Sequence, residues 1–361
     1  MPSPTVYFTE LPAESTLEQR LAATRRILQA CGLSRLIAPR DRTAVKIHVG
    51  EKHNTTHVAP PIVRAVVEAE KRAGGSPFLT ETSTLYKGER SNAVDHLRHA
   101  FAHGFGFEAI GAPFIMADGL TGNSEVEVPI RGLLFDKVAV AREVLLADSL
   151  VAVTHATGHM GNGLGAAIKN LGMGLASRMG KLRQHASLKP TVDPQACTFC
   201  AKCLKWCPAE AIVERGGKAF IVSELCIGCG ECLAVCRFDA VRHDWGPDIE
   251  LLQRRQAEHA LGVIQDKRDK LLVLSYLTDM TKDCDCMARA QERLQPDLGV
   301  LACRDPVAVD QAALDLTRER FGSSLAEAGW PAVDATVQLQ HGEKIGLGSR
   351  IYRLERLGSA G

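Results

Sequence analysis

The sequence predicts an α/β fold: a mostly parallel sheet with covering helices, interrupted by a small cysteine-rich α+β module. Three observations support this expectation. Short β-branched runs alternate with longer helical patterns on both sides of the middle of the chain, and glycine is frequent, at 32 of 361 residues. Eight of the twelve cysteines fall between Cys197 and Cys236. A chain more than twice as long as a typical domain of about 100–150 residues is expected to form more than one packing unit.

The first expected strand covers residues 43–49, where apolar residues alternate with Lys46 and His48. An amphipathic helix then opens at Pro60-Pro61 and stops at Gly74-Gly75, with proline at its start and glycine past its end. The other expected strands lie at residues 77–82, 149–154, 271–274 and 298–303, and the other expected helices at 90–103, within 163–174, and at 307–321. The last helix follows an Asp-Pro pair, an N-cap with proline at the first helical position.

The cysteine-rich block is expected to be an insertion between two α/β portions, because proline-containing turns flank it on both sides. We therefore expect three parts. Residues 1–190 form the first part of the α/β domain, residues 191–243 form the module, and residues 244–361 form the second part of the α/β domain.

The composition and the apolar runs of the sequence indicate which location and which partners to expect. Lys and Arg number 43 against 42 Asp and Glu, a formal net charge of +1, so neither a nucleic acid nor a membrane surface is expected as a partner. The first residues lack a basic segment followed by an apolar one, and no apolar run approaches the ~20 residues of a membrane span. A cytoplasmic location is expected, where dense cysteines are more often metal ligands than disulfides.

Two cysteine motifs repeat the spacing of bacterial iron–sulfur proteins. They read Cys197-x2-Cys200-x2-Cys203-x3-Cys207-Pro208 and Cys226-x2-Cys229-x2-Cys232-x3-Cys236. At this spacing three thiolates hold one 4Fe–4S cluster, and the fourth cysteine ligates the other cluster. The expected ligand sets are Cys197, Cys200 and Cys203 with Cys236, and Cys226, Cys229 and Cys232 with Cys207. Zinc is the competing interpretation, but zinc ribbons use four ligands in total rather than two complete quartets.

Polar residues follow three of the expected strands, at the edge where open α/β sheets bind ligands. Four are expected to be catalytic acid, base or binding groups: Lys46, His48, Glu81 and His159. The last of these leads into a glycine-rich loop, whose expected cofactor-binding residues are Gly163, Gly165, Lys169 and Asn170. These residues share a cleft only if the three strands are neighbours. Otherwise the histidines are solvated loop residues and the glycines permit tight packing.

A second group of cysteines lies near the C-terminus, in Asp283-Cys284-Asp285-Cys286 and at Cys303. Thiols at positions i and i+2 can face one metal ion, and Cys303 is expected to complete a three-thiolate site for a third metal or iron–sulfur centre. Two alternatives remain open, a redox-active pair and buried free thiols.

Together these residues resemble the domain-of-unknown-function 362 family, many members of which carry an inserted bacterial-type ferredoxin module. The segments that carry the resemblance are Lys46-x-His48-x-Gly50, Glu81 to Gly88, His155 to Gly174, Asp283 to Cys286 and Asp297 to Asp310. The resemblance implies an iron–sulfur protein with two 4Fe–4S clusters in a ferredoxin-like module. One departure is Arg237 after Cys236, where ferredoxins often have proline; it concerns local rigidity or potential rather than ligation. The glycine-rich loop alone is also similar to the lactate racemase family, whose nickel-pincer cofactor is not carried over.

Three hypotheses of function follow. In the first, the chain is a reductase-type enzyme whose clusters take electrons from a redox partner protein or low-potential donor and pass them to a small molecule in the α/β cleft. In the second, it is a non-catalytic electron carrier that docks to a larger redox complex. In the third, a metal at Cys284, Cys286 and Cys303 supports an isomerase or racemase, and the ferredoxin-like module is structural.

Overall fold

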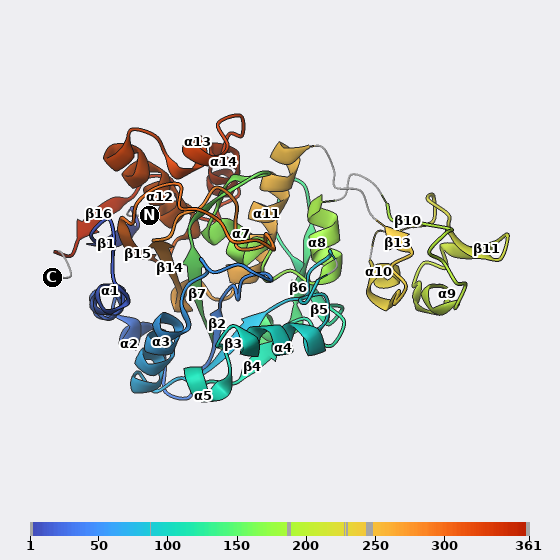
Figure 1. Ribbon diagram of the computed structural model, residues 1–361, viewed down its shortest axis with the longest axis horizontal. Coiled ribbons are helices and arrows are strands. Elements are labelled where there is room, and N and C mark those ends of the chain that lie inside the picture. Colours follow the sequence, from blue (N-terminus) through green and yellow to red (C-terminus); the bar gives the residue numbers. More distant parts are fainter. Residues whose placement is uncertain are drawn as a thin grey trace.

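The computed structural model describes residues 3–86, 88–185, 189–226, 228, 230–242 and 248–358. Its centre is an eight-stranded sheet (Figure 1). In spatial order the strands are β16 (Arg353–Arg356), β1 (Thr5–Glu10), β15 (Gly299–Cys303), β14 (Leu271–Leu277), β7 (Ser149–His155), β2 (Arg42–Lys46), β3 (Ser76–Glu81) and β4 (Phe114–Met116). Among these eight strands, β15 alone runs against both of its neighbours. The expected α/β class with a mostly parallel sheet is confirmed.

Helices cover both faces of this sheet, and each face buries its own apolar core. One face carries α1 (Leu17–Ala30), α2 (Leu33–Leu36), α3 (Pro60–Arg72), α4 (Ala93–Ala102) and α5 (Phe107–Ile110). The other carries α6 (Arg142–Leu146), α7 (Ala167–Gly172), α8 (Arg178–His185), α11 (Ile249–Ile264), α12 (Pro306–Phe321), α13 (Leu325–Gly329) and α14 (Thr336–Lys344). A single turn of 3-10 helix at Arg268–Lys270 leads into β14. Strands β7 and β14 are buried along their whole length, which explains their nearly continuous apolar sequences.

The local signals place the helix ends well. Helix α3 begins at Pro60, as the two prolines predict. Helix α12 begins at Pro306, and the Asp305 carboxylate caps it by accepting the N–H groups of Val307 at 2.9 Å and Ala308 at 3.0 Å. The helix ends before Gly322, whose φ of 80° suits glycine.

The two strands from the chain ends, β1 and the edge strand β16, were not predicted. Strand β1 pairs in parallel with β16, so Thr5 lies opposite Arg353. A strand whose partner is hundreds of residues away carries little local signal beyond a few alternating residues. The direction of β15 could not be predicted from its sequence either, because an apolar run of five residues fits a parallel or an antiparallel position equally well.

The cysteine-rich segment forms small elements outside the eight-stranded sheet, to one side of it in Figure 1. They are β10 (Thr191–Val192), α9 (Lys202–Trp206), β11 (Ile212–Arg215), β12 (Lys218–Ile221), α10 (Glu231–Val235) and β13 (Val241–Arg242). Strand β10 pairs with β13 and β11 with β12, around a separate apolar cluster. The module touches the α/β part where Asn123 Nδ2 donates to Glu231 Oε2 at 3.0 Å.

Two further strand pairs lie outside the main sheet: β5 (Glu125–Pro129) with β6 (Lys137–Ala141), and β8 (Thr157–His159) with β9 (Gly163–Gly165). The second pair is the glycine-rich segment after β7, and it leads directly into α7. Among the helices that the structure describes, none has both the length and the apolar composition needed to cross a bilayer.

Candidate functional site

One group of thiols in the module surrounds Cys203. Burial raises the pKa of the Cys203 thiol, and the nearby thiols of Cys236 and Cys200 raise it further. Cys197 adds to the same effect and therefore belongs to this group. Phe199 adopts a positive φ of 50°, which turns the chain between two of the cysteines, and its N–H donates to Cys197 Sγ at 3.4 Å. The four sulfurs are those that the spacing predicts for one cluster.

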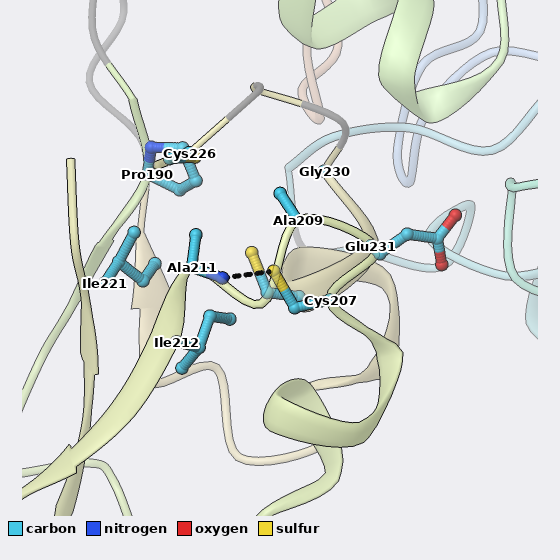
Figure 2. Close-up of a pocket in the computed structure, with 10 residues that line it drawn as sticks. Pro190, Cys207, Ala209, Ala211, Ile212, Ile221, Cys226, Gly230 and Glu231 are labelled. Atoms are coloured by element: carbon cyan, nitrogen blue, oxygen red, sulfur yellow. Dashed lines mark hydrogen bonds between the residues drawn. The ribbon is translucent and has the colours of Figure 1, made fainter. Parts of the chain in front are cut away.

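A second group of cysteines lines a pocket of the module (Figure 2). Cys207, Cys226 and Cys232 face it, together with apolar side chains from β11 and β12. The Ala211 N–H donates to Cys207 Sγ at 3.3 Å. Cys229, the remaining expected ligand, lies outside the described residues.

The two groups exchange one cysteine each between the motifs. Cys236 of the second motif lies with the first three cysteines, and Cys207 of the first motif lies with the second group. Thiols grouped in this way, with backbone N–H groups directed at sulfur and apolar surroundings, are what a 4Fe–4S cluster requires. The described residues of both groups therefore fit such clusters.

The polar strand ends of the α/β part meet at one edge of the sheet, because β7, β2 and β3 are neighbours. Lys46, at the end of β2, places its Nζ 3.3 Å from Glu81 Oε1 and 2.8 Å from Asn170 Oδ1. Lys46 is 1% exposed and Glu81 is 3% exposed, so this ion pair is shielded from water. The three strands are thus neighbours, which is the condition that a shared site at their ends requires.

Glu81 is the centre of a buried charge network. Its carboxylate lies 3.4 Å from Arg90 Nη1 and 2.9 Å from His96 Nε2. Burial opposes ionisation, but the cations of Lys46 and Arg90 prevail and hold the pKa of Glu81 well below its ordinary value. Arg90 also donates to Glu51 Oε1 at 2.7 Å. The network therefore holds paired charges, with the Lys46 amine buried against the Glu81 carboxylate.

His48 lies half-buried beside this network. Its Nδ1 accepts the N–H of Gly50 at 3.0 Å. Burial lowers the pKa of His48 well below its ordinary value, and the nearby Arg90 charge lowers it further. The ring is therefore neutral at physiological pH, a state in which a histidine can accept a proton.

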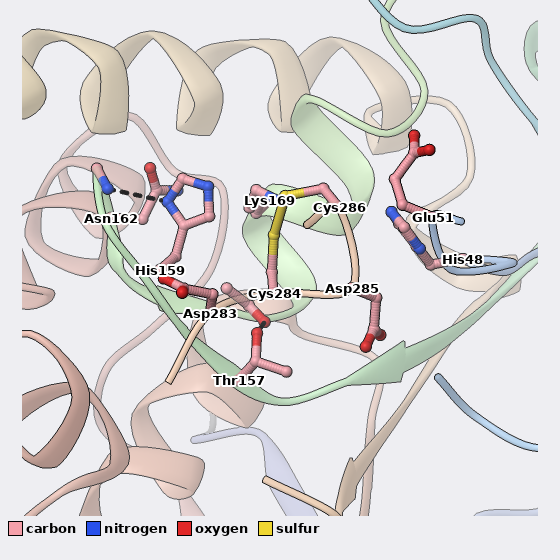
Figure 3. Close-up of a disulfide and its surroundings, with 12 residues drawn as sticks. His48, Glu51, Thr157, His159, Asn162, Lys169, Asp283, Cys284, Asp285 and Cys286 are labelled. Carbon is pink, nitrogen blue, oxygen red and sulfur yellow. Dashed lines mark hydrogen bonds between the residues drawn. A yellow bond between two sulfur atoms is a disulfide. The ribbon is translucent and has the colours of Figure 1, made fainter. Parts of the chain in front are cut away.

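Cys284 and Cys286, in the loop after β14, are joined by a disulfide (Figure 3). Lys169 Nζ lies 3.3 Å from Cys284 Sγ and 3.9 Å from Cys286 Sγ. A ring nitrogen of His159 and the two sulfurs all lie within 4.8 Å of one another. The fold thus brings two residues of the glycine-rich segment to the cysteine pair. As free thiols, the pair and His159 have the donor types that hold a soft metal ion.

The two nitrogen groups beside the disulfide have lowered basicity. Burial lowers the pKa of Lys169 to about 8, and the Arg90 charge contributes in the same direction. Burial also lowers the pKa of His159 well below its ordinary value, with a further contribution from the Lys169 charge. At neutral pH, Lys169 is therefore mostly charged and His159 is neutral.

The tautomer of His159 follows from its backbone contact. Nδ1 accepts the N–H of Gly161 at 3.1 Å, so the neutral ring carries its proton on Nε2. That second nitrogen is turned toward Lys169 and the disulfide (Figure 3).

Asp285 holds the cysteine loop against the strand ends. Its Oδ2 lies 2.9 Å from His155 Nδ1, and His155 Nε2 lies 2.8 Å from the Thr278 carbonyl, so both ring nitrogens are donors. Burial opposes both charges, but the pairing lowers the pKa of Asp285 and raises that of His155. The Asp285 carbonyl also accepts the N–H of Glu51 at 2.9 Å, which ties the loop to the segment after β2.

Glycines allow the loop and the β8–β9 pair to pack closely. A side chain at Gly158 would collide with the carbonyl of Lys282. A Cβ at Gly165 would lie 3.4 Å from the Cys284 Cβ, and Gly163 has a φ of 67° with protein atoms filling the space beside it. Gly163 and Gly165 are thus packed against the protein itself, which is the alternative role that the sequence left open for them.

Cys303 does not join Cys284 and Cys286, which corrects the expected three-thiolate site. Because β15 is antiparallel to β14, Cys303 lies opposite Val273, near the start of β14, whereas the cysteine loop follows the end of β14. The two therefore lie at opposite edges of the sheet. Burial raises the pKa of Cys303 to about 12, as expected for a buried free thiol.

Sequence reasoning missed two features of this site. Arg90 was expected only as a helix start, whereas α4 begins at Ala93 and Arg90 is a buried cation in the preceding loop. The pairing of His155 with Asp285 spans 130 residues. Nothing in the local pattern distinguishes a buried arginine from an exposed one, so an alignment of relatives is the signal that would find them.

Parts of this chain are similar to known proteins. The family described as Domain of unknown function (DUF362) matches residues 43–315. The formate dehydrogenase-O iron-sulfur subunit of Escherichia coli K12 is 41% identical over 69 residues, which make up 18% of this chain and 23% of that subunit. The pyruvate synthase subunit PorD of Thermotoga maritima is 30% identical over 86 residues, or 22% of this chain and 84% of that subunit. A 7Fe ferredoxin of Hydrogenibacillus schlegelii is 36% identical over 52 residues, or 14% of this chain and 67% of that protein.

Two solved structures share a low level of similarity with the chain. The lactate racemase apoprotein from Thermoanaerobacterium thermosaccharolyticum has 10% sequence identity and a TM-score of 0.38, with 75% of this chain and 56% of that chain covered. A protein from Thermotoga maritima has 12% identity and a TM-score of 0.37, with 81% and 59% covered.

Proposed function

We propose, since this chain belongs to the DUF362 family, that it is an iron–sulfur electron-transfer protein whose module holds two 4Fe–4S clusters. The observation that carries this proposal is the exchange of Cys207 and Cys236 between the two groups of thiols. This exchange is the ligand pattern of two-cluster ferredoxins. The similarity to an iron-sulfur subunit, to PorD and to a ferredoxin supports it.

The cysteines of the module and two of its backbone N–H groups have different tasks in this proposal. When bound, 4Fe–4S clusters supply one-electron transfer at potentials that depend on hydrogen bonds to sulfur and on solvent exposure. In the first set Cys197, Cys200, Cys203 and Cys236 supply the thiolates, and in the second set Cys207, Cys226, Cys229 and Cys232. The N–H groups of Phe199 and Ala211 donate to ligand sulfurs and stabilise their negative charge.

We further propose that the electrons serve a reductase-type reaction in the α/β part. Lys46, His48, Glu81 and His159 are the acid, base or binding groups of this proposal, and Lys169 and Asn170 bind an anionic part of a small molecule. The convergence of the three strand ends supports it, since ligands of open α/β sheets bind at that edge. The electrons come from a redox partner protein or a low-potential donor. Several relatives are subunits of redox complexes by name, which supports a partner protein.

Metal and sulfide analysis of anaerobically purified protein tests the cluster proposal. About eight irons and a matching amount of labile sulfide per chain are expected. Zinc without labile sulfide would refute the clusters.

The rates of substrate turnover and of cluster reduction distinguish a reductase from a simple electron carrier. With clusters intact by electron paramagnetic resonance, His48→Ala is expected to lower substrate turnover without changing the rate at which the clusters accept electrons. A carrier predicts that neither rate changes.

A further inference from the structure

We propose that Cys284 and Cys286 form a redox-active dithiol–disulfide pair that reduces low-molecular-weight disulfides. The inference rests on the proposed function for the source of its electrons, the iron–sulfur module. It assigns a substrate class to the polar edge of the sheet and a chemical task to Lys169 and His159.

The first argument is the placement of the two sulfurs. They are bonded to each other, and the loop that carries them is held by Asp285 between the two cysteines and by the Lys282 carbonyl before them. The Trp330 indole N–H donates to the Lys282 carbonyl at 2.9 Å. A pair of thiols held together in this way closes to a disulfide within one loop, so oxidation and reduction need no rearrangement of the fold.

The second argument is the unequal exposure of the two cysteines. Cys284 is 6% exposed, whereas Cys286 is half-buried. A disulfide substrate can therefore reach the Cys286 sulfur first, and Cys284 is left behind it as the resolving thiol. Limited access at Cys286 favours a small substrate over a folded protein.

The third argument is the charge beside the sulfurs. Lys169 Nζ is closer to Cys284 than to Cys286, at 3.3 Å against 3.9 Å. The ammonium group stabilises the thiolate of either cysteine, and most strongly that of Cys284, the thiolate that attacks the mixed disulfide at Cys286. The buried position of Lys169 strengthens this interaction, because water does not screen it.

The fourth argument is the orientation of His159. Its Nδ1 is occupied by the Gly161 N–H, and its Nε2–H is turned to the side of the sulfurs. A neutral imidazole in this tautomer donates a hydrogen bond to a thiolate and so stabilises its negative charge. The same tautomer disfavours a metal at Nε2, because a metal-bound histidine normally donates its other ring N–H to an acceptor rather than facing a donor.

The reaction balances in two halves. In the first, the Cys286 thiolate attacks the substrate disulfide, and the first substrate thiolate leaves and takes up the proton of the Lys169 ammonium group. The Cys284 thiolate then attacks the Cys286 sulfur and releases the second substrate thiolate, which takes its proton from water. The protein is thereby oxidised to the Cys284–Cys286 disulfide. In the second half this disulfide takes up two electrons and two protons and its sulfur–sulfur bond breaks. The electrons are supplied singly by a low-potential one-electron donor through the module.

A redox titration tests the pair without depending on the clusters. The anaerobic full-length protein is equilibrated with mixtures of reduced and oxidised dithiothreitol, unfolded in an alkylating reagent, and analysed by peptide mass spectrometry. Cys284 and Cys286 are expected to change together from protected to alkylated, while Cys31 and Cys303 are alkylated throughout. If both cysteines are free at every ratio, or hold a stoichiometric metal ion that persists under reduction, the inference is overturned.

Turnover tests the assigned substrate class. Reduced methyl viologen serves as the one-electron donor and oxidised glutathione as the disulfide, and the release of glutathione is measured. Cys286→Ser and Cys284→Ser are each expected to lower the rate at least about ten-fold with the cluster spectrum intact. Cys31→Ala is the matched control and is expected to leave the rate unchanged. Wild-type turnover by Cys286→Ser overturns the inference.

The two experiments separate the two proposals. A protein without iron whose cysteine pair still titrates with dithiothreitol contradicts the proposed function and retains the redox pair. A protein with two reducible clusters whose Cys284 and Cys286 never form a disulfide retains the proposed function and refutes the redox pair.

Discussion

The ammonium group of Lys169 lies 3.3 Å from the sulfur of Cys284. The two residues are 115 positions apart, and the contact exists because α7 and the loop after β14 meet at the same edge of the sheet. It joins the glycine-rich segment to the cysteine pair in one local environment.

Lys169→Met is therefore expected to make the reduced cysteine pair less reactive. Removal of a positive charge in contact with a thiolate lowers the thiolate fraction, and alkylation of the reduced pair at neutral pH slows by about ten-fold. Lys169→Arg keeps the charge and is expected to restore most of the rate. Equal alkylation rates in the methionine variant and the wild type contradict the assignment.

The exchange of cysteines between motifs predicts which cluster each variant loses. Cys203→Ser and Cys236→Ser should leave the same remaining paramagnetic signal, because both residues belong to the first ligand set. Cys207→Ser and Cys232→Ser should leave the other signal. Iron falls in each case from about eight to about four per chain. Should Cys236→Ser behave like Cys232→Ser instead, the two ligand sets are assigned wrongly.

Lys46→Met is expected to destabilise the protein, because it leaves the buried Glu81 carboxylate with fewer cations. Breaking a buried ion pair of this kind costs about 3 kcal/mol in the free energy of unfolding, measured by urea denaturation. The double variant Lys46→Met with Glu81→Gln should recover part of the loss. Arg42→Met is the control, since its pair with Asp148 is exposed to solvent, and it should change stability little.

The buried carboxyl of Glu70 is expected to make the free energy of unfolding fall as the pH rises. This carboxyl is fully buried on α3, and burial raises its pKa well above the ordinary value of 4.5. The folded state therefore keeps a proton that the unfolded chain loses, so stability is fully present below the ordinary value and falls as the pH rises toward the folded pKa.

Glu70→Gln should remove this dependence. The wild-type free energy of unfolding is expected to fall by up to about 1.4 kcal/mol per pH unit relative to the variant above about pH 5. Parallel curves for the two proteins across this range contradict a protonated Glu70.

The fold was predictable where local signals are strong. Pro60 and Asp305-Pro306 mark helix starts through the geometry of the first turn, and the structure begins α3 and α12 there. Strands β1 and β16, from the two ends of the chain, were not predictable in this way. They pair with each other across almost the whole length of the chain, and each segment carries only a few alternating residues as a local signal.

Parts of the candidate site were likewise predictable from local sequence, and other parts were not. The cysteine spacing alone predicted both groups of module thiols as far as the structure describes them, because the spacing places three ligands of a cluster within one motif and the fourth in the other motif. The partners of the remaining thiols depended on the direction of a single strand. The antiparallel β15 moves Cys303 to the far edge of the sheet, and the β8–β9 pair brings His159 to the near one.

By itself the sequence therefore determined the α/β class, the position of the cysteine-rich module and the polar strand ends. These properties follow from the periodicity and spacing of residues that are close together in the sequence. Only the tertiary structure decided that Lys169 and His159, rather than Cys303, stand beside Cys284 and Cys286, and that Arg90 is buried against Glu81. Such contacts arise from strand order and direction, which follow from the burial of two apolar cores by the chain as a whole.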